Sequence, residues 1–156
     1  MALPPLQIHP LLERFRGRHP NTPGPEQSLP SIAPEAVQLR LAWQDPELGW
    51  LLRLHRDGQH VGKLGYRVCE KCRWGSILKI SIYDPLRGCG LGRRVVSLLR
   101  EQHPGLTWHT IGQYPEAIRV WQQMAAESGQ PYDVQDIRCH PVPEPTPLDG
   151  YLITSW

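Results

Sequence analysis

A glycine-rich segment between an expected strand and an expected helix constrains the fold of this chain most. The segment is Arg87-Gly88-Cys89-Gly90-Leu91-Gly92. Residues 76–83 before it alternate apolar and polar side chains, which predicts a half-buried strand, and residues 91–102 after it carry apolar residues at helical spacing. Glycines that join a strand directly to a helix leave unpaired backbone N–H groups where the helix dipole is positive. The segment therefore predicts a site for phosphate or pyrophosphate.

The glycine spacing narrows the choice of phosphate ligand. The dinucleotide motif G-x-G-x-x-G requires a glycine where this chain has Arg93, and the nucleoside-triphosphate loop has no match. The pattern R-x-x-G-x-G, formed by Arg87, Gly90 and Gly92, resembles the motif of the GNAT superfamily of acyl-CoA-dependent N-acyltransferases. This resemblance implies that residues 87–93 hold the pyrophosphate of coenzyme A. A turn that needs glycine only for its backbone conformation is the alternative.

The elements after the motif follow the order that is typical of this superfamily. Residues 106–111 predict a strand, and Tyr114-Pro115-Glu116 begins a second helix. The resemblance implies an α/β (α+β) fold with a mixed, mostly antiparallel twisted sheet, a central splayed parallel strand pair and helices packed on it. It also implies that the backbones of Ile80 and Ile82 pair with the pantetheine arm of acetyl-CoA.

Proline and turn residues divide the chain into two parts. Residues 1–35 form a proline-rich arm, in which residues 10–16 have the spacing of a short helix that docks on the domain. Residues 36–156 form the GNAT-like domain. Its first three strands are expected in an antiparallel meander and its last strand at the end of the chain, at residues 36–43, 50–56, 60–68 and 150–156.

The short connection between the first two strands departs from the superfamily, which usually has two helices there that wall the acceptor pocket. Either the acceptor site is open to a large substrate, or the arm folds over it. We prefer the arm, because the strand face that carries Ile77, Lys79, Ser81 and Tyr83 otherwise lacks a cover.

Length, composition and net charge limit the class of protein that this chain can be. A chain of 156 residues with 40% apolar content suits one domain, and it has no apolar run long enough to span a membrane. A net charge of +2 argues against a nucleic-acid partner. Because the first residues lack the pattern of a secretory signal, we expect a cytoplasmic protein whose cysteines are thiols or metal ligands.

Four residues suggest a zinc site. Cys69 and Cys72 form C-x-x-C in an expected turn, a spacing that lets both thiolates reach one tetrahedral Zn²⁺. The strand order brings Cys139 and His140 to the same end of the sheet, with His103 as an alternative fourth ligand. A set of unrelated thiols is the other interpretation.

The catalytic residues are less clear than the coenzyme motif. Relatives often use a glutamate on the motif strand as general base, but this strand has Lys79 and Ser81 there. The candidate bases are Asp84, Glu116 and His109, and a water relay or a pre-deprotonated amine remains open.

Relatives often read Asn-x-x-x-Ala-x-x-x-Tyr in the second helix, where this chain has Gln113, Ala117 and Trp121. Because tryptophan cannot protonate a thiolate, Tyr114 is the candidate acid and Tyr83 a second option. The sequence thus predicts an acetyl-CoA-dependent N-acetyltransferase acting on a primary amine of a small molecule or protein. The alternative is a non-catalytic module of the same fold that binds acyl-CoA or a protein partner.

Overall fold

The computed structural model describes residues 36–137, 140 and 145–156 of the chain. The expected arm of residues 1–35, with its helix at residues 10–16, lies outside the described residues. In chain order the described elements are β1 (Val37–Asp45), β2 (Gly49–Arg56), β3 (Gln59–Cys69), β4 (Trp74–Ile82), α2 (Leu91–Gln102), β5 (Thr107–Thr110), the 3₁₀ helix η1 (Pro115–Ala117), α3 (Ile118–Ser128) and β6 (Leu152–Ile153).

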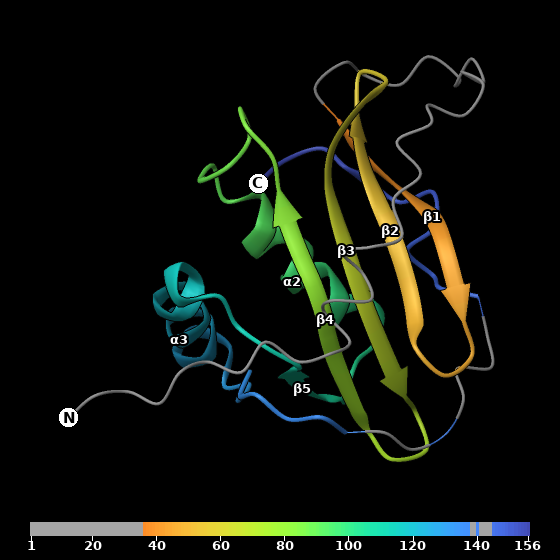
Figure 1. Cartoon of the computed structure of the whole chain (residues 1–156), viewed down its shortest axis with the longest axis vertical. Coiled ribbons are helices and arrows are strands. Elements are labelled where there is room, and N and C mark those ends of the chain that lie inside the picture. The colour runs from red at the N-terminus through yellow and green to blue at the C-terminus, as the bar shows by residue number, and fades with distance from the viewer. Residues whose placement is uncertain (1–35, 138–139, 141–144) are drawn as a thin grey trace.

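One mixed sheet organises these elements (Figure 1). Its strand order is β5-β4-β3-β2-β1-β6, in which only the β4–β5 pair is parallel. The α+β class and the predominantly antiparallel sheet are therefore confirmed. The expected central position of the parallel pair is wrong, because β5 lies at the end of the strand order. Beyond β5, the described chain adds only an isolated bridge at Val134, since β6 pairs with β1 instead.

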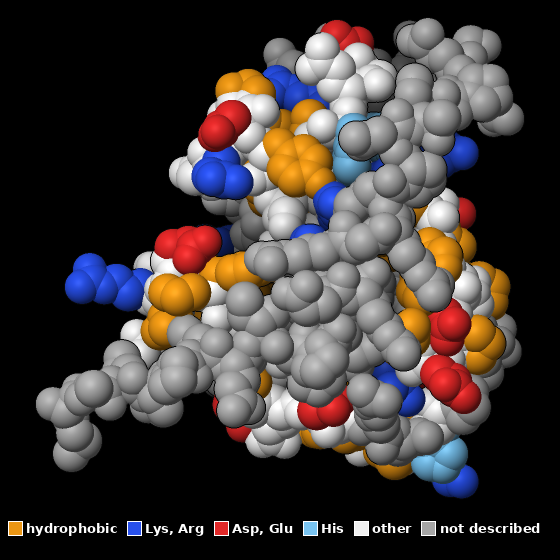
Figure 2. Space-filling model, viewed as in Figure 1, with side chains coloured by type: hydrophobic (Ala, Val, Ile, Leu, Met, Phe, Trp, Pro, Cys, Tyr) orange, Lys and Arg blue, Asp and Glu red, His pale blue; other side chains and the backbone are white. Residues whose placement is uncertain are grey.

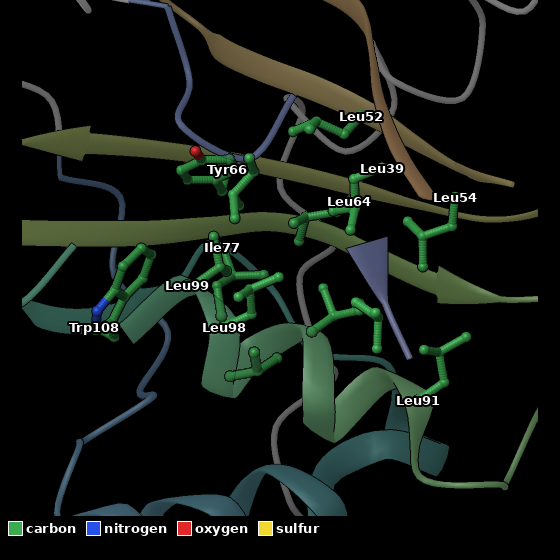
Figure 3. Close-up of a cluster of buried hydrophobic side chains, with 14 of the residues drawn as sticks. Leu39, Leu52, Leu54, Leu64, Tyr66, Ile77, Leu91, Leu98, Leu99 and Trp108 are labelled. Atoms are coloured by element: carbon green, nitrogen blue, oxygen red, sulfur yellow. The ribbon is translucent and has the colours of Figure 1, made fainter. Parts of the chain in front are cut away.

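The main core lies between the sheet and the two helices. Leu91, Val95, Leu98 and Leu99 face the sheet from α2, and they are the residues whose helical spacing predicts this face. Figure 3 shows leucines of α2 pointing toward side chains of the sheet and toward Trp108. Helix α3 contributes the buried Trp121 and Met124 to the same cluster. Burial of apolar surface therefore fixes both helices on one face of the sheet.

The opposite face of the sheet carries a smaller apolar cluster of Leu51, Leu78 and Ile111. A β-bulge in β4 at Leu78 creates this arrangement, because the register with β3 shifts between Lys79 and Ile77. The extra residue lets Ile77 and Ile80 both face the main core. The expectation that Ile77 shares the uncovered face with Lys79 is therefore wrong.

The end of the chain forms less strand than expected. Only Leu152–Ile153 are extended within residues 150–156, and they pair with Gln38 and Val37 of β1. After Ile153 the chain leaves the sheet, and Trp156 reaches the glycine-rich segment. Neither of the helices in the described part of the chain is both long and apolar enough to cross a bilayer.

Candidate functional site

The glycine-rich segment forms an open bend between β4 and α2. Gly88 and Gly90 have φ angles of 79° and 91°, in the left-handed region that favours glycine. Gly90 is the N-cap residue of α2, where no side chain caps the helix, and the first turn contains no acidic residue. A Cβ atom added at Gly88 or Gly90 would meet nothing within 4 Å. The first-turn N–H groups of α2 therefore have the orientation and the space to receive an anion.

Side chains of the bend hold it against both the preceding strand and the chain end. The Arg87 Nε group donates a hydrogen bond of 3.3 Å to the carbonyl of Ile82. The Cys89 thiol donates to the carbonyl of the buried Leu86 at 2.7 Å and accepts a bond of 3.1 Å from the indole N–H of Trp156. Cys89 is thus tied within the fold, and backbone groups remain as the principal donors of the bend.

The side chain of Arg93, at the start of α2, contacts α3. Its guanidinium forms an ion pair with Glu127 of α3, and this contact holds the pKa of the Glu127 carboxyl below its usual range. Both side chains are partly exposed, so the pair is of the surface type that contributes little stability. Arg93 therefore connects the start of α2 to α3.

Strands β4 and β5 diverge beside the bulge at Leu78. Their pairing ends at Ile77 and Thr110, after which the N–H of Ile111 donates a bond of 3.2 Å to the carbonyl of Ile77. Strand β4 continues to Ile82 with no β5 residue beside it. Because the Tyr83 N–H donates to Val61 of β3, alternation turns the backbone groups of Ile80 and Ile82 away from β3.

The diverging edge of β4 leads directly to the start of α2. A Cβ atom added at Gly92 would lie 3.6 Å from the Ile82 side chain and 3.8 Å from that of Ile80. The first turn of α2 thus lies over these two residues, and Figure 1 shows α2 beginning near the far end of β4. An extended ligand on the β4 edge would reach the first-turn N–H groups with its end.

A histidine–aspartate pair lies on β5, close to the divergence. The Nδ1 atom of His109, a predicted candidate base, is 2.5 Å from a carboxylate oxygen of Asp133. His109 is 8% exposed. Burial acts to raise the pKa of the Asp133 carboxyl, but hydrogen bonds from His109 and Gln135 outweigh it, so its pKa lies below its ordinary value. An ionised Asp133 accepts the Nδ1 proton and leaves Nε2 of His109 as the basic nitrogen.

Asp133 was not predicted from the sequence. It belongs to the irregular segment after α3, which runs beside β5 through hydrogen bonds of Thr110 with the backbones of Asp133 and Gln135. The surrounding residues have no periodic pattern that would signal this pairing.

The other candidate catalytic residues do not gather at one place. Asp84 follows the far end of β4 and is exposed, whereas His109 pairs with Ser76 near its beginning, roughly 25 Å away at the rise of a strand. Tyr114 lies three residues after Ile111, at the N-cap of η1, and the exposed Glu116 follows it. His109 thus lies on β5 next to the divergence, Asp84 lies at the far end of β4, and Tyr114 follows the divergence by three residues.

The second helix has the packing role that its sequence indicates. The Gln113 amide donates bonds to the Thr110 hydroxyl at 3.2 Å and the Tyr132 carbonyl at 2.6 Å. Trp121 is buried against the ring of Tyr132, with 5.5 Å between ring centroids. Trp121 is thus a core residue.

Cys69, Cys72 and His140 come together at the opposite end of the sheet. One ligand atom of each lies within 4.8 Å of the others. The predicted partner Cys139 lies outside the described residues. The alternative ligand His103 is not part of the cluster, because its Nε2 atom is 3.1 Å from the Tyr66 hydroxyl and its Nδ1 atom 3.6 Å from Glu70.

The described side chains that are visible on the sheet face opposite the helices have no dominant charge. Figure 2 shows basic and acidic side chains interspersed where described side chains can be seen. No protein-family model matches the chain, and no curated protein sequence matches it.

Proposed function

We propose that this chain is a GNAT-like, acetyl-CoA-dependent N-acetyltransferase that acts on a primary amine. The observation that carries the proposal is the uncapped glycine bend of α2, which lies at the end of the strand edge opened by β4 and β5. Neither feature alone selects acyl-CoA. Together they offer amides for a diphosphate and an extended edge for a chain that contains amide groups.

The proposed coenzyme lies along β4. Its diphosphate accepts hydrogen bonds from the N–H groups of residues 88 and 90–92, since the N–H of Cys89 donates to Leu86. The side chain of Arg87 adds positive charge nearby. The backbones of Ile80 and Ile82 pair with the pantetheine arm. The thioester then lies beside Ile77 and Ile111, where a backbone N–H group polarises its carbonyl.

The proposed chemistry uses the two candidate residues near the divergence. Nε2 of His109 takes one proton from the ammonium form of the acceptor, and the neutral amine attacks the thioester carbonyl carbon. The C–N bond forms, the C–S bond breaks, and the thiolate takes the hydroxyl proton of Tyr114. The proton lost by the new amide restores Tyr114, and His109 gives its proton to solvent, so the reaction releases one proton.

The protein environment of the proposal is the cytoplasm. Acetyl-CoA is a substrate of that compartment, in which cysteines are generally thiols or metal ligands and not disulfides. The domain is expected to comprise residues 36–156.

Titration calorimetry with acetyl-CoA, followed by a free-thiol assay over a panel of amines, tests the proposal. We expect binding by the full chain, thiol release with at least one amine, and at least tenfold weaker binding by Arg87→Gln. Arg119→Gln removes an exposed arginine of α3 and should bind like the wild type. Binding without thiol release by any amine would favour the non-catalytic module, and absence of binding would contradict both.

A further inference from the structure

Three side chains from two distant parts of the sequence form a compact set of metal-ligand atoms. Cys69 ends β3, Cys72 lies in the turn between β3 and β4, and His140 comes from the segment between α3 and β6. The Nδ1 atom of His140 is 3.4 Å from the Cys69 sulfur and 3.7 Å from the Cys72 sulfur. In Figure 1 the chain after α3 approaches the turn between β3 and β4.

These distances match the edges of a tetrahedron around zinc. Zn–S bonds of about 2.3 Å and Zn–N bonds of about 2.0 Å place sulfur and nitrogen ligands about 3.5 Å apart at the tetrahedral angle. Both measured sulfur–nitrogen distances lie within 0.2 Å of this value. Two thiolates and an imidazole are also the donor types that zinc prefers.

The surrounding backbone holds the ligands in this geometry. The N–H of Cys72 donates to the sulfur of Cys69 at 3.4 Å, which orients the first thiolate and disperses its charge. Arg73, with a φ of 61°, lets the turn return into β4. The guanidinium of Arg67 donates to the carbonyl of His140 at 3.2 Å while stacking 5.6 Å from the ring centre of Trp74. Hydrogen bonds that fix the position of a ligand residue in this way are typical of metal sites.

We propose that Cys69, Cys72 and His140 bind a structural Zn²⁺ ion that fastens the segment after α3 to the turn between β3 and β4. A water molecule takes the fourth position. The site lies at the end of the sheet opposite the glycine bend, so it stabilises the fold without taking part in acyl transfer. Neighbouring buried contacts join the same parts of the chain, since the Tyr66 hydroxyl bonds to Thr146 and to His103.

Zinc analysis of the full chain tests the site directly. Protein produced with added Zn²⁺ and purified without chelator should contain about one zinc per chain. His140→Ala and Cys72→Ser should each reduce this content at least tenfold, because each removes a ligand. Cys89→Ser, which removes a cysteine at the other end of the sheet, should keep the wild-type content. Near-zero zinc in the wild type, or unchanged zinc in both ligand variants, would overturn the proposal.

Cobalt substitution gives a readout that does not depend on activity. Co²⁺ added to zinc-free protein should produce thiolate charge-transfer and tetrahedral d–d absorption bands, and Zn²⁺ should abolish them. Cys72 is exposed, so Cys72→Ser should remain folded and should lose most of the intensity of these bands. Bands unchanged in Cys72→Ser, or a Cys69–Cys72 disulfide found by mass spectrometry in protein purified without oxidant, would contradict the site. Acetyl-CoA titration of the zinc-free protein separates this result from the proposed enzyme function.

Discussion

Tyr114 tests the proton-donor assignment at the scale of one residue. Removal of its hydroxyl in Tyr114→Phe should lower kcat about 100-fold, because the departing thiolate then lacks its acid. The KM for acetyl-CoA should stay near the wild-type value, since the proposed coenzyme contacts lie on β4 and α2. Steady-state thiol release measures both constants.

Tyr151→Phe is the matched control, because Tyr151 packs on the core beside β6. Full turnover by Tyr114→Phe would exclude Tyr114 as the acid. Tyr83, the second option, follows the far end of β4 beside Asp84 and is thus distant from the divergence. Burial raises the pKa of the Tyr83 phenol, which keeps it protonated at neutral pH.

A second prediction for a single residue concerns Asp133, because its carboxylate fixes the tautomer of His109. Asp133→Asn keeps the size of the side chain but accepts the Nδ1 proton less strongly, so kcat should fall at least 100-fold. The folded pKa of Asp133 lies below 3.8, so its contribution to stability is present above that pH and lost as the pH falls through the folded value. Asp133→Asn should therefore unfold with a weaker acid dependence in urea titrations.

Asp136→Asn changes an exposed carboxylate of the same segment and should keep wild-type kcat. Equal losses of kcat in both variants would show that the segment, and not the His109–Asp133 contact, matters.

Packing of β5 on β4 makes a prediction at the scale of elements. A Cβ atom at Gly75 would lie 2.6 Å from the ring of Trp108, which is 1% exposed and has little room to move. Gly75→Ala should therefore lower the free energy of unfolding by about 1–3 kcal/mol, the usual cost of overpacking. Urea denaturation measures it. Gly65→Ala is the control, because its Cβ would meet neighbours at an ordinary 3.5 Å.

Most elements could be predicted from local pattern, but their pairing in space could not. The alternation in residues 76–83 predicts a strand, yet it gives no sign of the bulge at Leu78 that turns Ile77 to the core. The bulge depends on the register with β3, which only the folded sheet sets. The edge position of β5 and the short β6 likewise depend on contacts between distant segments.

At the scale of the whole molecule, cationic side chains on β2, β3 and β4 predict that the free energy of unfolding depends on pH in the alkaline range. Burial, with charge repulsion from Lys79 and Arg53, lowers the pKa of Lys63 from 10.5 to about 8. Because the unfolded chain then binds more protons between these values, the free energy of unfolding should rise as the pH rises from about 8 toward 10.5. Below about pH 8 Lys63 is protonated in both states, so the full cost of burying its charge lowers the free energy of unfolding.

Urea denaturation across this pH range should show a smaller rise in Lys63→Met than in the wild type. Lys71→Met alters an exposed lysine and should keep the wild-type slope. If the free energy of unfolding of Lys63→Met rises with pH as steeply as that of the wild type, other groups cause the alkaline dependence.

In the candidate site, too, contiguous motifs could be predicted from the sequence, whereas contacts between distant segments were harder to predict. The glycine bend and the C-x-x-C turn are short contiguous motifs, so their residues could be predicted from the sequence. His140 was predicted because strand order brings its segment to that end of the sheet. Asp133 was not predicted, because it contacts His109 only where an irregular segment runs along β5.

The contact between the Trp156 indole and the Cys89 sulfur gives the bend an intrinsic optical reporter. A thiol at 3.1 Å quenches indole emission, and Trp156 is 38% exposed beside the residues proposed to hold the coenzyme. A diphosphate bound at the bend, as proposed, would change the surroundings of this fluorophore. Ligand arrival can thus be followed in real time on the unlabelled chain, with Trp156→Phe isolating the share of this ring from that of the other tryptophans.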